Sequence, residues 1–211
     1  MSVQFPAKSI RVADLLNSTL MVGQYRGEET WRNLEKLMDG AARATLVLID
    51  IREAMPLQYT FCQYAFGPLF KALDDGRWHD KFVIFRMLDF HRSGFFRGVL
   101  KHLQADLPRK DAEKEFVRAG FCAKLIVGDD KQISFVGDLT QDQVQTLSAV
   151  NRLTRVTARQ LVATLSLSEE SIVDTLRFLV SKWLIAAGGT GTQDAHIYYS
   201  LYKYLDEGET P

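Results

Sequence analysis

The segment LSLSEESIVDTLRFLVSKWLIAAGG, residues 165–189, runs from a polar corner through a helix into a strand. The corner ends in Ser168, a residue type that caps helix N-termini. Apolar residues then recur at helical spacing, at Ile172, Leu176 and Leu179, before a strand-like run and a glycine pair. This pattern predicts an amphipathic helix that buries one face and is followed directly by a strand.

The flanking sequence extends this segment into a small domain. Spacing and capping residues predict helices at residues 140–153, 157–165 and 168–182, and strands at 183–187 and 195–203. This order resembles the winged helix-turn-helix of many bacterial regulators, with residues 188–194 as the tip of the wing. The resemblance implies a DNA-binding module. The alternative is a buried all-helical core with an additional hairpin.

The N-terminal part of the chain alternates strand-like and helix-like segments. One or two strands are predicted within residues 9–23, and further strands at 44–50 and 81–88. The predicted helices lie at 27–38, 59–73 and 95–103. The strand at 44–50 is a continuous apolar run, as expected for a strand covered on both faces, and residues 81–88 are expected to form another buried strand. We expect an α/β layer domain with parallel strand pairing, in which Gly67–Pro68 kinks or breaks its helix.

A charged connection at residues 107–115 and a hairpin, with strands at 123–127 and 132–136, complete this part. The predicted domain boundary falls near Gly137. The chain is therefore divided into an α/β domain, residues 1–137, and a winged helix domain, residues 138–211.

One motif of the α/β part, LVLIDIREAMPLQYTF, resembles the STAS and STAS-like families. The matching positions are Asp50, Ile51, Ala54, Leu57, Thr60 and Phe61. The resemblance covers about residues 10–105 and implies that Thr60, a hydroxyl at a helix N-terminus, is a phosphorylation switch. Added negative charge is favourable at that end of a helix. The alternative is that Thr60 merely caps the helix.

The hairpin segment CAKLIVGDD is similar to the His-x-Lys-x4-Asp element of phospholipase D-type phosphodiesterases. Lys124 and Asp129 match, but Cys122 stands where that family has its histidine. Loss of the histidine removes the nucleophile or general acid, so we expect no enzymatic activity. The alternatives are a plain hairpin or a degenerate phosphodiesterase. No metal-ligand spacing or phosphate loop is found, and we predict no catalytic residue, metal or cofactor.

The composition gives no global attraction to nucleic acid or to an anionic membrane. The 211 residues include 26 Lys and Arg against 26 Asp and Glu, so the formal charge is zero. The two cysteines, Cys62 and Cys122, are far apart, and the N-terminus has no apolar targeting segment. We expect a cytoplasmic protein without a membrane association.

The predicted winged helix is acidic where DNA binding would require positive charge. Residues 140–211 contain six Lys and Arg against eight Asp and Glu, and Glu169, Glu170 and Asp174 lie early in the third helix. Against this, three arginines cluster around the start of the second helix. The candidate DNA contacts are Arg152, Arg155, Arg159, Ser171, Thr175, Arg177, Gln193 and His196. An exposed Val173 and Phe178 would instead suit a protein interface.

These observations favour a non-enzymatic regulator. Its α/β domain would sense or dock a partner, and its winged helix would bind DNA weakly as a homodimer. The alternative is a protein–protein adaptor in which the winged helix also docks a protein.

Overall fold

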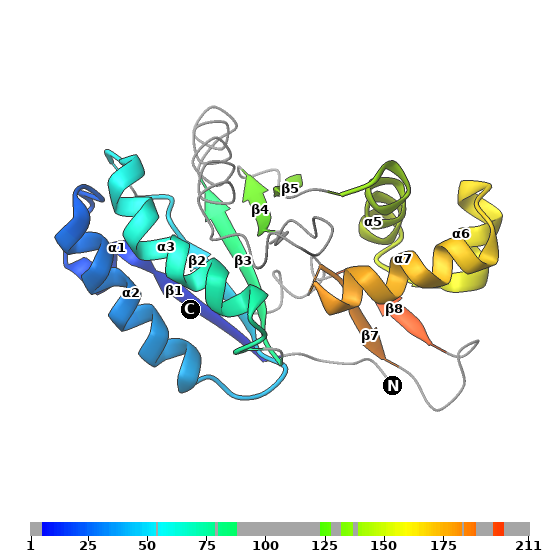
Figure 1. Cartoon of the computed structure of the whole chain (residues 1–211), viewed down its shortest axis with the longest axis horizontal. Helices are drawn as coiled ribbons and strands as arrows, with labels where there is room; N and C mark the ends of the chain where they lie inside the picture. The colour runs from blue at the N-terminus through cyan, green and yellow to red at the C-terminus, as the bar shows by residue number, and fades with distance from the viewer. Residues whose placement is uncertain are drawn as a thin grey trace, which may run out of the picture. The chain divides into compact units, whose positions relative to one another are not determined.

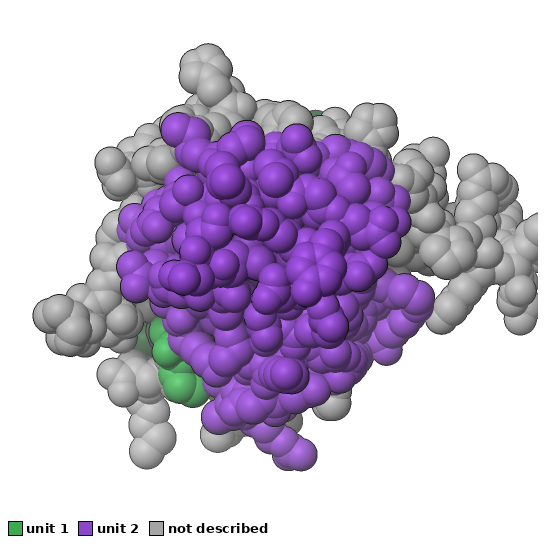
Figure 2. Space-filling model, turned by 90° about the vertical axis from the view of Figure 1, so that its left-hand side faces the viewer, with its two compact units in different colours: residues 1–7, 139–211 green, residues 8–138 purple. Residues whose placement is uncertain are grey.

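The computed structural model describes residues 6–53, 55–78, 80–87, 123–127, 132–136, 139–182, 184–188 and 196–200. The chain divides into two compact units, coloured separately in Figure 2. The first, here the α/β unit, spans residues 8–138. The second, here the C-terminal unit, spans residues 139–211 together with residues 1–7.

The α/β unit is built around one sheet of five strands. Its strands are β1 (Ala7–Arg11), β2 (Leu46–Asp50), β3 (Phe82–Met87), β4 (Ala123–Val127) and β5 (Gln132–Val136), and they lie in this order across the sheet. Strands β2, β3 and β4 pair in parallel, whereas β4 and β5 form an antiparallel hairpin. The predictions of a mixed α/β fold, of parallel pairing and of the hairpin are confirmed.

Three helices belong to the described part of this unit: α1 (Val12–Leu16), α2 (Gln24–Asp39) and α3 (Tyr59–Asp74). Figure 1 shows α2 and α3 side by side against the sheet. All five residues of β2 are buried, as its continuous apolar run predicts. One hydrophobic core joins β1, β2 and β3 to the three helices, and Phe61, Phe66, Phe70 and Phe85 are among its largest buried side chains.

Of the one or two strands expected within residues 9–23, the structure has one named strand, β1, which is followed by the short helix α1. One prediction for the α/β unit is corrected by the structure. Helix α3 continues through Gly67–Pro68 without a break. Pro68 removes one backbone donor, but Phe66, Leu69 and Phe70 around it are buried, so core packing holds the helix together. The predicted helix at 95–103 and the connection at 107–115 lie outside the described residues.

The C-terminal unit contains three helices: α5 (Gln141–Leu153), α6 (Ala158–Leu165) and α7 (Glu169–Ser181). Each begins at a side-chain cap, because Thr140, Thr157 and Ser168 accept hydrogen bonds from the backbone of the following turn. The first two caps are capping boxes. All three helices were predicted, with ends within one or two residues of those observed.

A three-stranded antiparallel sheet completes this unit, with β6 (Arg155–Thr157), β7 (Ala186–Gly188) and β8 (Ile197–Tyr199) in the order β6-β8-β7. The sequence does not predict β6, because three residues between two helices carry no periodic signal. The strand expected at 183–187 is displaced to β7, since the backbone N–H of Leu184 still bonds to the carbonyl of Leu179 at the end of α7. In Figure 1, α7 runs across β7 and β8.

No helix among the described residues combines the length and the apolar character needed to cross a membrane.

Candidate nucleic-acid interface

Three exposed arginines lie where α5 ends and α6 begins, and we call them the arginine trio: Arg152, Arg155 and Arg159. Arg152 belongs to the last turn of α5, Arg155 begins β6, and Arg159 is the second residue of α6. Within the described part of the chain, none of the three side chains has an ion-pair or hydrogen-bond partner. The trio therefore offers three uncompensated positive charges to solvent.

The charge of Arg159 does not stabilise the helix to which it belongs. A cation at a helix N-terminus opposes the helix dipole, whose positive end lies there. The first turn of α6 contains no acidic residue that would offset this charge. The arrangement instead suits an external anion, because the free N–H groups of a first turn and a nearby guanidinium both attract phosphate.

The backbone that carries the trio is held by several hydrogen bonds. Strand β6 pairs with β8, with Arg155 opposite Tyr199. The backbone N–H of Ser200 donates to the carbonyl of Thr154 at 2.9 Å, and the Ser200 hydroxyl donates to Oδ1 of Asn151 at 2.9 Å. These bonds connect the end of α5 to the central strand, so the three arginines extend from a fixed framework.

Helix α7 presents a different kind of surface. Its exposed residues at helical spacing, here the outer stripe of α7, are Glu170, Asp174, Arg177 and Ser181. Nη1 of Arg177 lies 3.3 Å from Oδ1 of Asp174, and the two side chains are 63% and 67% exposed. The single cation of the stripe is thus paired with a carboxylate of the same helix.

Several predicted contact residues occupy other environments. Thr175 is buried, with 7% exposure, and does not lie on the outer side as expected. It precedes Leu179 by one turn, so the buried face of α7 is wider than the three apolar positions suggested. Val173 and Phe178 are half-buried, so the exposed apolar pair expected for a protein interface is not present.

The remaining candidate DNA contacts on the C-terminal unit are bonded within the unit, half-buried or not described. The Ser171 hydroxyl donates to Oδ2 of Asp142 at 3.3 Å and thereby joins α7 to α5. His196 is half-buried immediately before β8, and Gln193 lies outside the described residues.

The sequence pattern did not reveal the Asp174–Arg177 pair, although its i, i+3 spacing is a signal for such pairs. Arg177 also lies near Tyr198 of β8. Burial raises the pKa of Tyr198, and the positive charge of Arg177 opposes that rise.

Thr60 is exposed in the first turn of α3. The N-cap of that helix is Gln58, which makes no side-chain capping bond, and the first turn contains no acidic residue. The interpretation of Thr60 as the helix cap is therefore wrong. Its hydroxyl is accessible at an N-terminus that lacks a compensating negative charge.

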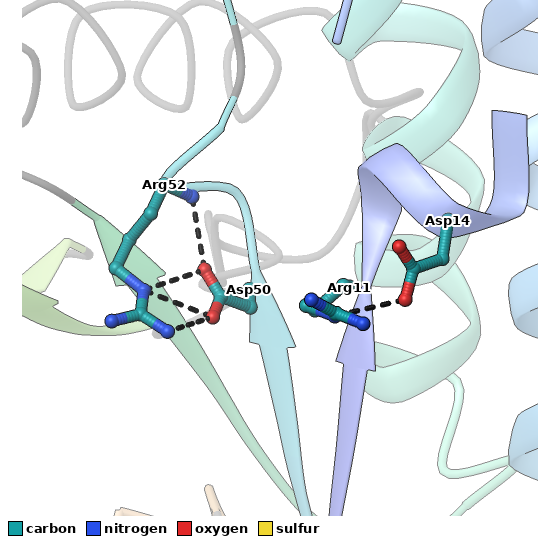
Figure 3. Close-up of polar contacts among 4 residues, drawn as sticks. All are labelled: Arg11, Asp14, Asp50 and Arg52. Atoms are coloured by element: carbon teal, nitrogen blue, oxygen red, sulfur yellow. Dashed lines mark hydrogen bonds and ion pairs between the residues drawn. The ribbon is translucent and has the colours of Figure 1, made fainter. Parts of the chain in front are cut away.

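A partly buried ion pair between Asp50 and Arg52 lies at the end of β2, ahead of this helix (Figure 3). Asp50 is 5% exposed, and both of its carboxylate oxygens accept hydrogen bonds from Arg52, the shortest being 2.6 Å from Nη2 to Oδ2. The backbone N–H of Arg52 also donates to Oδ1. Figure 3 shows a second pair, Arg11 and Asp14, which joins β1 to α1. These pairs fix the turn after β2 and the start of α1.

Of the residues of the phosphodiesterase alternative, the structure describes only Lys124. Lys124 belongs to β4, opposite Phe135 of β5, whereas Cys122 and Asp129 lie outside the described residues. In the described ranges no group of three or more His, Cys, Asp or Glu residues is arranged to hold a metal. Cys62 is fully buried, and desolvation raises the pKa of its thiol, which makes it a poor nucleophile.

The sequence matches no protein-family model, and the search of curated proteins finds no relative.

Proposed function

We propose that the protein is a non-enzymatic regulator whose C-terminal unit is a winged helix that binds DNA weakly. The support for the winged helix is the element order α5-β6-α6-α7-β7-β8 together with the sheet order β6-β8-β7. In that arrangement α6 and α7 correspond to the helix-turn-helix, and β7 and β8 flank the wing.

The single observation that carries DNA binding is the arginine trio. Three exposed guanidinium groups, which have no partner in the part of the chain that the structure describes, lie on a framework held by backbone hydrogen bonds. Phosphate contacts supply most of the affinity of non-specific DNA binding, and arginine makes them in a bidentate manner. We expect contacts between the arginine trio and phosphate groups to supply most of the DNA-binding affinity.

The outer stripe of α7 argues that the binding is weak and tolerant of sequence. Base reading in the major groove relies on Arg, Lys, Asn or Gln, and the only such residue of the stripe, Arg177, is engaged by Asp174. Two copies would double the number of phosphate contacts, so the DNA-bound form is proposed to be a homodimer.

The α/β unit is proposed to be a STAS-like sensing or docking domain. Among its exposed large apolar side chains are Leu20 and Met55. They belong to two segments that are joined where the backbone N–H of Met55 donates to the carbonyl of Thr19 at 2.9 Å. The same two exposed side chains are the observation that favours the adaptor alternative, because apolar surface of this kind suits a protein partner.

Fluorescence anisotropy with a labelled duplex tests the DNA proposal. The double variant Arg155→Ala/Arg159→Ala should lose about tenfold or more in affinity at low salt, since it removes two of three phosphate contacts. The matched control is Arg32→Ala/Arg43→Ala, which removes two exposed arginines from the α/β unit. Equal loss in both variants, or no binding by the parent chain at low salt, would favour the adaptor.

A further inference from the structure

The Asp174–Arg177 pair is suited to regulate the proposed DNA contact, and this inference rests on the proposed function. The two residues occupy successive positions of the outer stripe of α7, at an N–O distance of 3.3 Å. Both side chains are mostly exposed, so the pair contributes little to folding. The next carboxylate of the stripe, Glu170, has no hydrogen-bond or ion-pair partner in the described part of the chain.

Arg177 is also close to the central strand of the sheet. Its charge acts on Tyr198 of β8, and β8 pairs directly with β6, the strand that carries Arg155. Arg177 therefore belongs to the same helix–sheet framework as the arginine trio and is the one cation that α7 exposes on its outer stripe.

We infer that Asp174 is an internal counter-ion that competes with DNA phosphates for Arg177 and thereby keeps the affinity low. With Asp174 ionised, Arg177 must leave its partner before it can contact a phosphate. The carboxylate would then remain unpaired near the polyanion. An exposed pair of this type shifts an equilibrium by about two- to fivefold, which is enough to tune weak binding without abolishing it.

The inference makes Arg177 necessary for any gain that follows loss of Asp174. Simple repulsion between Asp174 and DNA would operate whether or not Arg177 is present. Competition for Arg177 requires the guanidinium. A double-mutant cycle separates the two cases.

The experiment measures duplex affinity and its salt dependence for the parent chain, Asp174→Asn, Arg177→Ala and Asp174→Asn/Arg177→Ala. Glu170→Gln is the matched control, because it removes the same charge one turn earlier from a residue without a partner. All three substituted residues are exposed, and circular dichroism verifies the helix content of each variant.

We expect Asp174→Asn to bind about fivefold more tightly than the parent, with a log–log salt slope steeper by about 0.9, which corresponds to one added phosphate contact. In the Arg177→Ala background the same substitution, like Glu170→Gln in the parent, should gain at most about twofold. The inference is overturned if Asp174→Asn raises the duplex affinity equally with and without Arg177. It is also overturned if Glu170→Gln raises the affinity as much as Asp174→Asn does. In both cases the proposed DNA binding itself is retained. Absence of duplex binding in every chain overturns the proposed function and the inference with it.

Discussion

Gly27 sets how closely α2 and α3 approach each other. A Cβ at this position would lie 2.7 Å from the carbonyl oxygen of Phe61 and 2.8 Å from Cβ of Tyr64. Both neighbours belong to α3 and cannot move away unless the helix shifts. Only a residue without a Cβ therefore allows the two helices to pack at this distance.

Gly27→Ala should lower the free energy of unfolding by about 1–3 kcal/mol, the usual cost of overpacking. Gly40→Ala is the control, because its Cβ would meet only Lys36 and Leu37 carbonyl oxygens, the nearer at 3.3 Å. Urea denaturation measures both. If the two variants are equally stable, α2 and α3 are not in contact at Gly27.

The surroundings of Thr60 in the α/β unit favour an added negative charge. This residue is exposed at the start of a 16-residue helix whose first turn contains no acidic group. This environment is compatible with phosphorylation, which remains a proposal.

Thr60→Glu should raise the free energy of unfolding by about 0.3–1 kcal/mol at low ionic strength, and Thr60→Lys should lower it by a similar amount, because the helix dipole favours the anion. Thr60→Gln serves as the neutral reference. Thermal or urea unfolding at two salt concentrations provides the measurement. Identical stabilities for the Glu and Lys variants at low salt would argue against an N-terminal site at Thr60.

At the scale of elements, α7 combines a buried face wider than expected with a charged outer stripe. Ile172, Leu176 and Leu179 are fully buried, as their spacing predicts. Thr175 joins them, and Arg177 faces outward beside Asp174 and near Tyr198. The helix therefore packs into the unit with one face and exposes carboxylates and a paired arginine on the other.

The influence of Arg177 on Tyr198 can be measured directly. Burial raises the pKa of this phenol above that of an unfolded chain, so the native state retains the proton longer and the stability that depends on it falls as the pH rises above about 10. Arg177→Ala should raise the pKa of Tyr198 further, since a nearby cation that favours the phenolate is lost. The spectrophotometric titration of the parent and of Arg177→Ala, each compared with its Tyr198→Phe counterpart, isolates this group. An unchanged or lower pKa would place Arg177 away from β8.

Long apolar runs and capping residues were enough to predict most helices and the parallel strands of the α/β unit. All five residues of β2 are buried, as are Phe82, Ile84 and Phe85 of β3. Thr140 and Ser168 mark helix starts. Strand β6 was not predicted, because a segment of only three residues forms a strand through its pairing with β8 and not through its own sequence pattern. Pro68 appeared to break α3 because its tertiary packing is not visible in the sequence.

The candidate site was predicted in part. The arginine trio is recognisable from the sequence as a local cluster, but the partners of each side chain are not. That Arg177 is paired, that Thr175 is buried and that Ser171 bonds to Asp142 all depend on how α7 packs and on which rotamers meet. Contacts of this kind follow from the fold and not from local spacing.

At the scale of the whole molecule, positive and negative charges are equal in number, and an excess of positive charge occurs only locally. The chain carries 26 basic and 26 acidic residues, so no net field draws it to DNA. In the proposed function, attraction comes from short-range contacts with the arginine trio, within a Debye length of about 10 Å at 0.1 M salt. The affinity should accordingly be modest and strongly reduced by salt.

The salt dependence of duplex binding tests this claim most directly. Three phosphate contacts per protomer predict a log–log slope of about −3 for one protomer and about twice that value for a homodimer. Arg155→Ala/Arg159→Ala should reduce the slope to about −1 per protomer, because a single contact, that of Arg152, remains. A slope near zero in the parent chain, or an unchanged slope in the double variant, would contradict the assignment of the arginine trio as the DNA-binding surface.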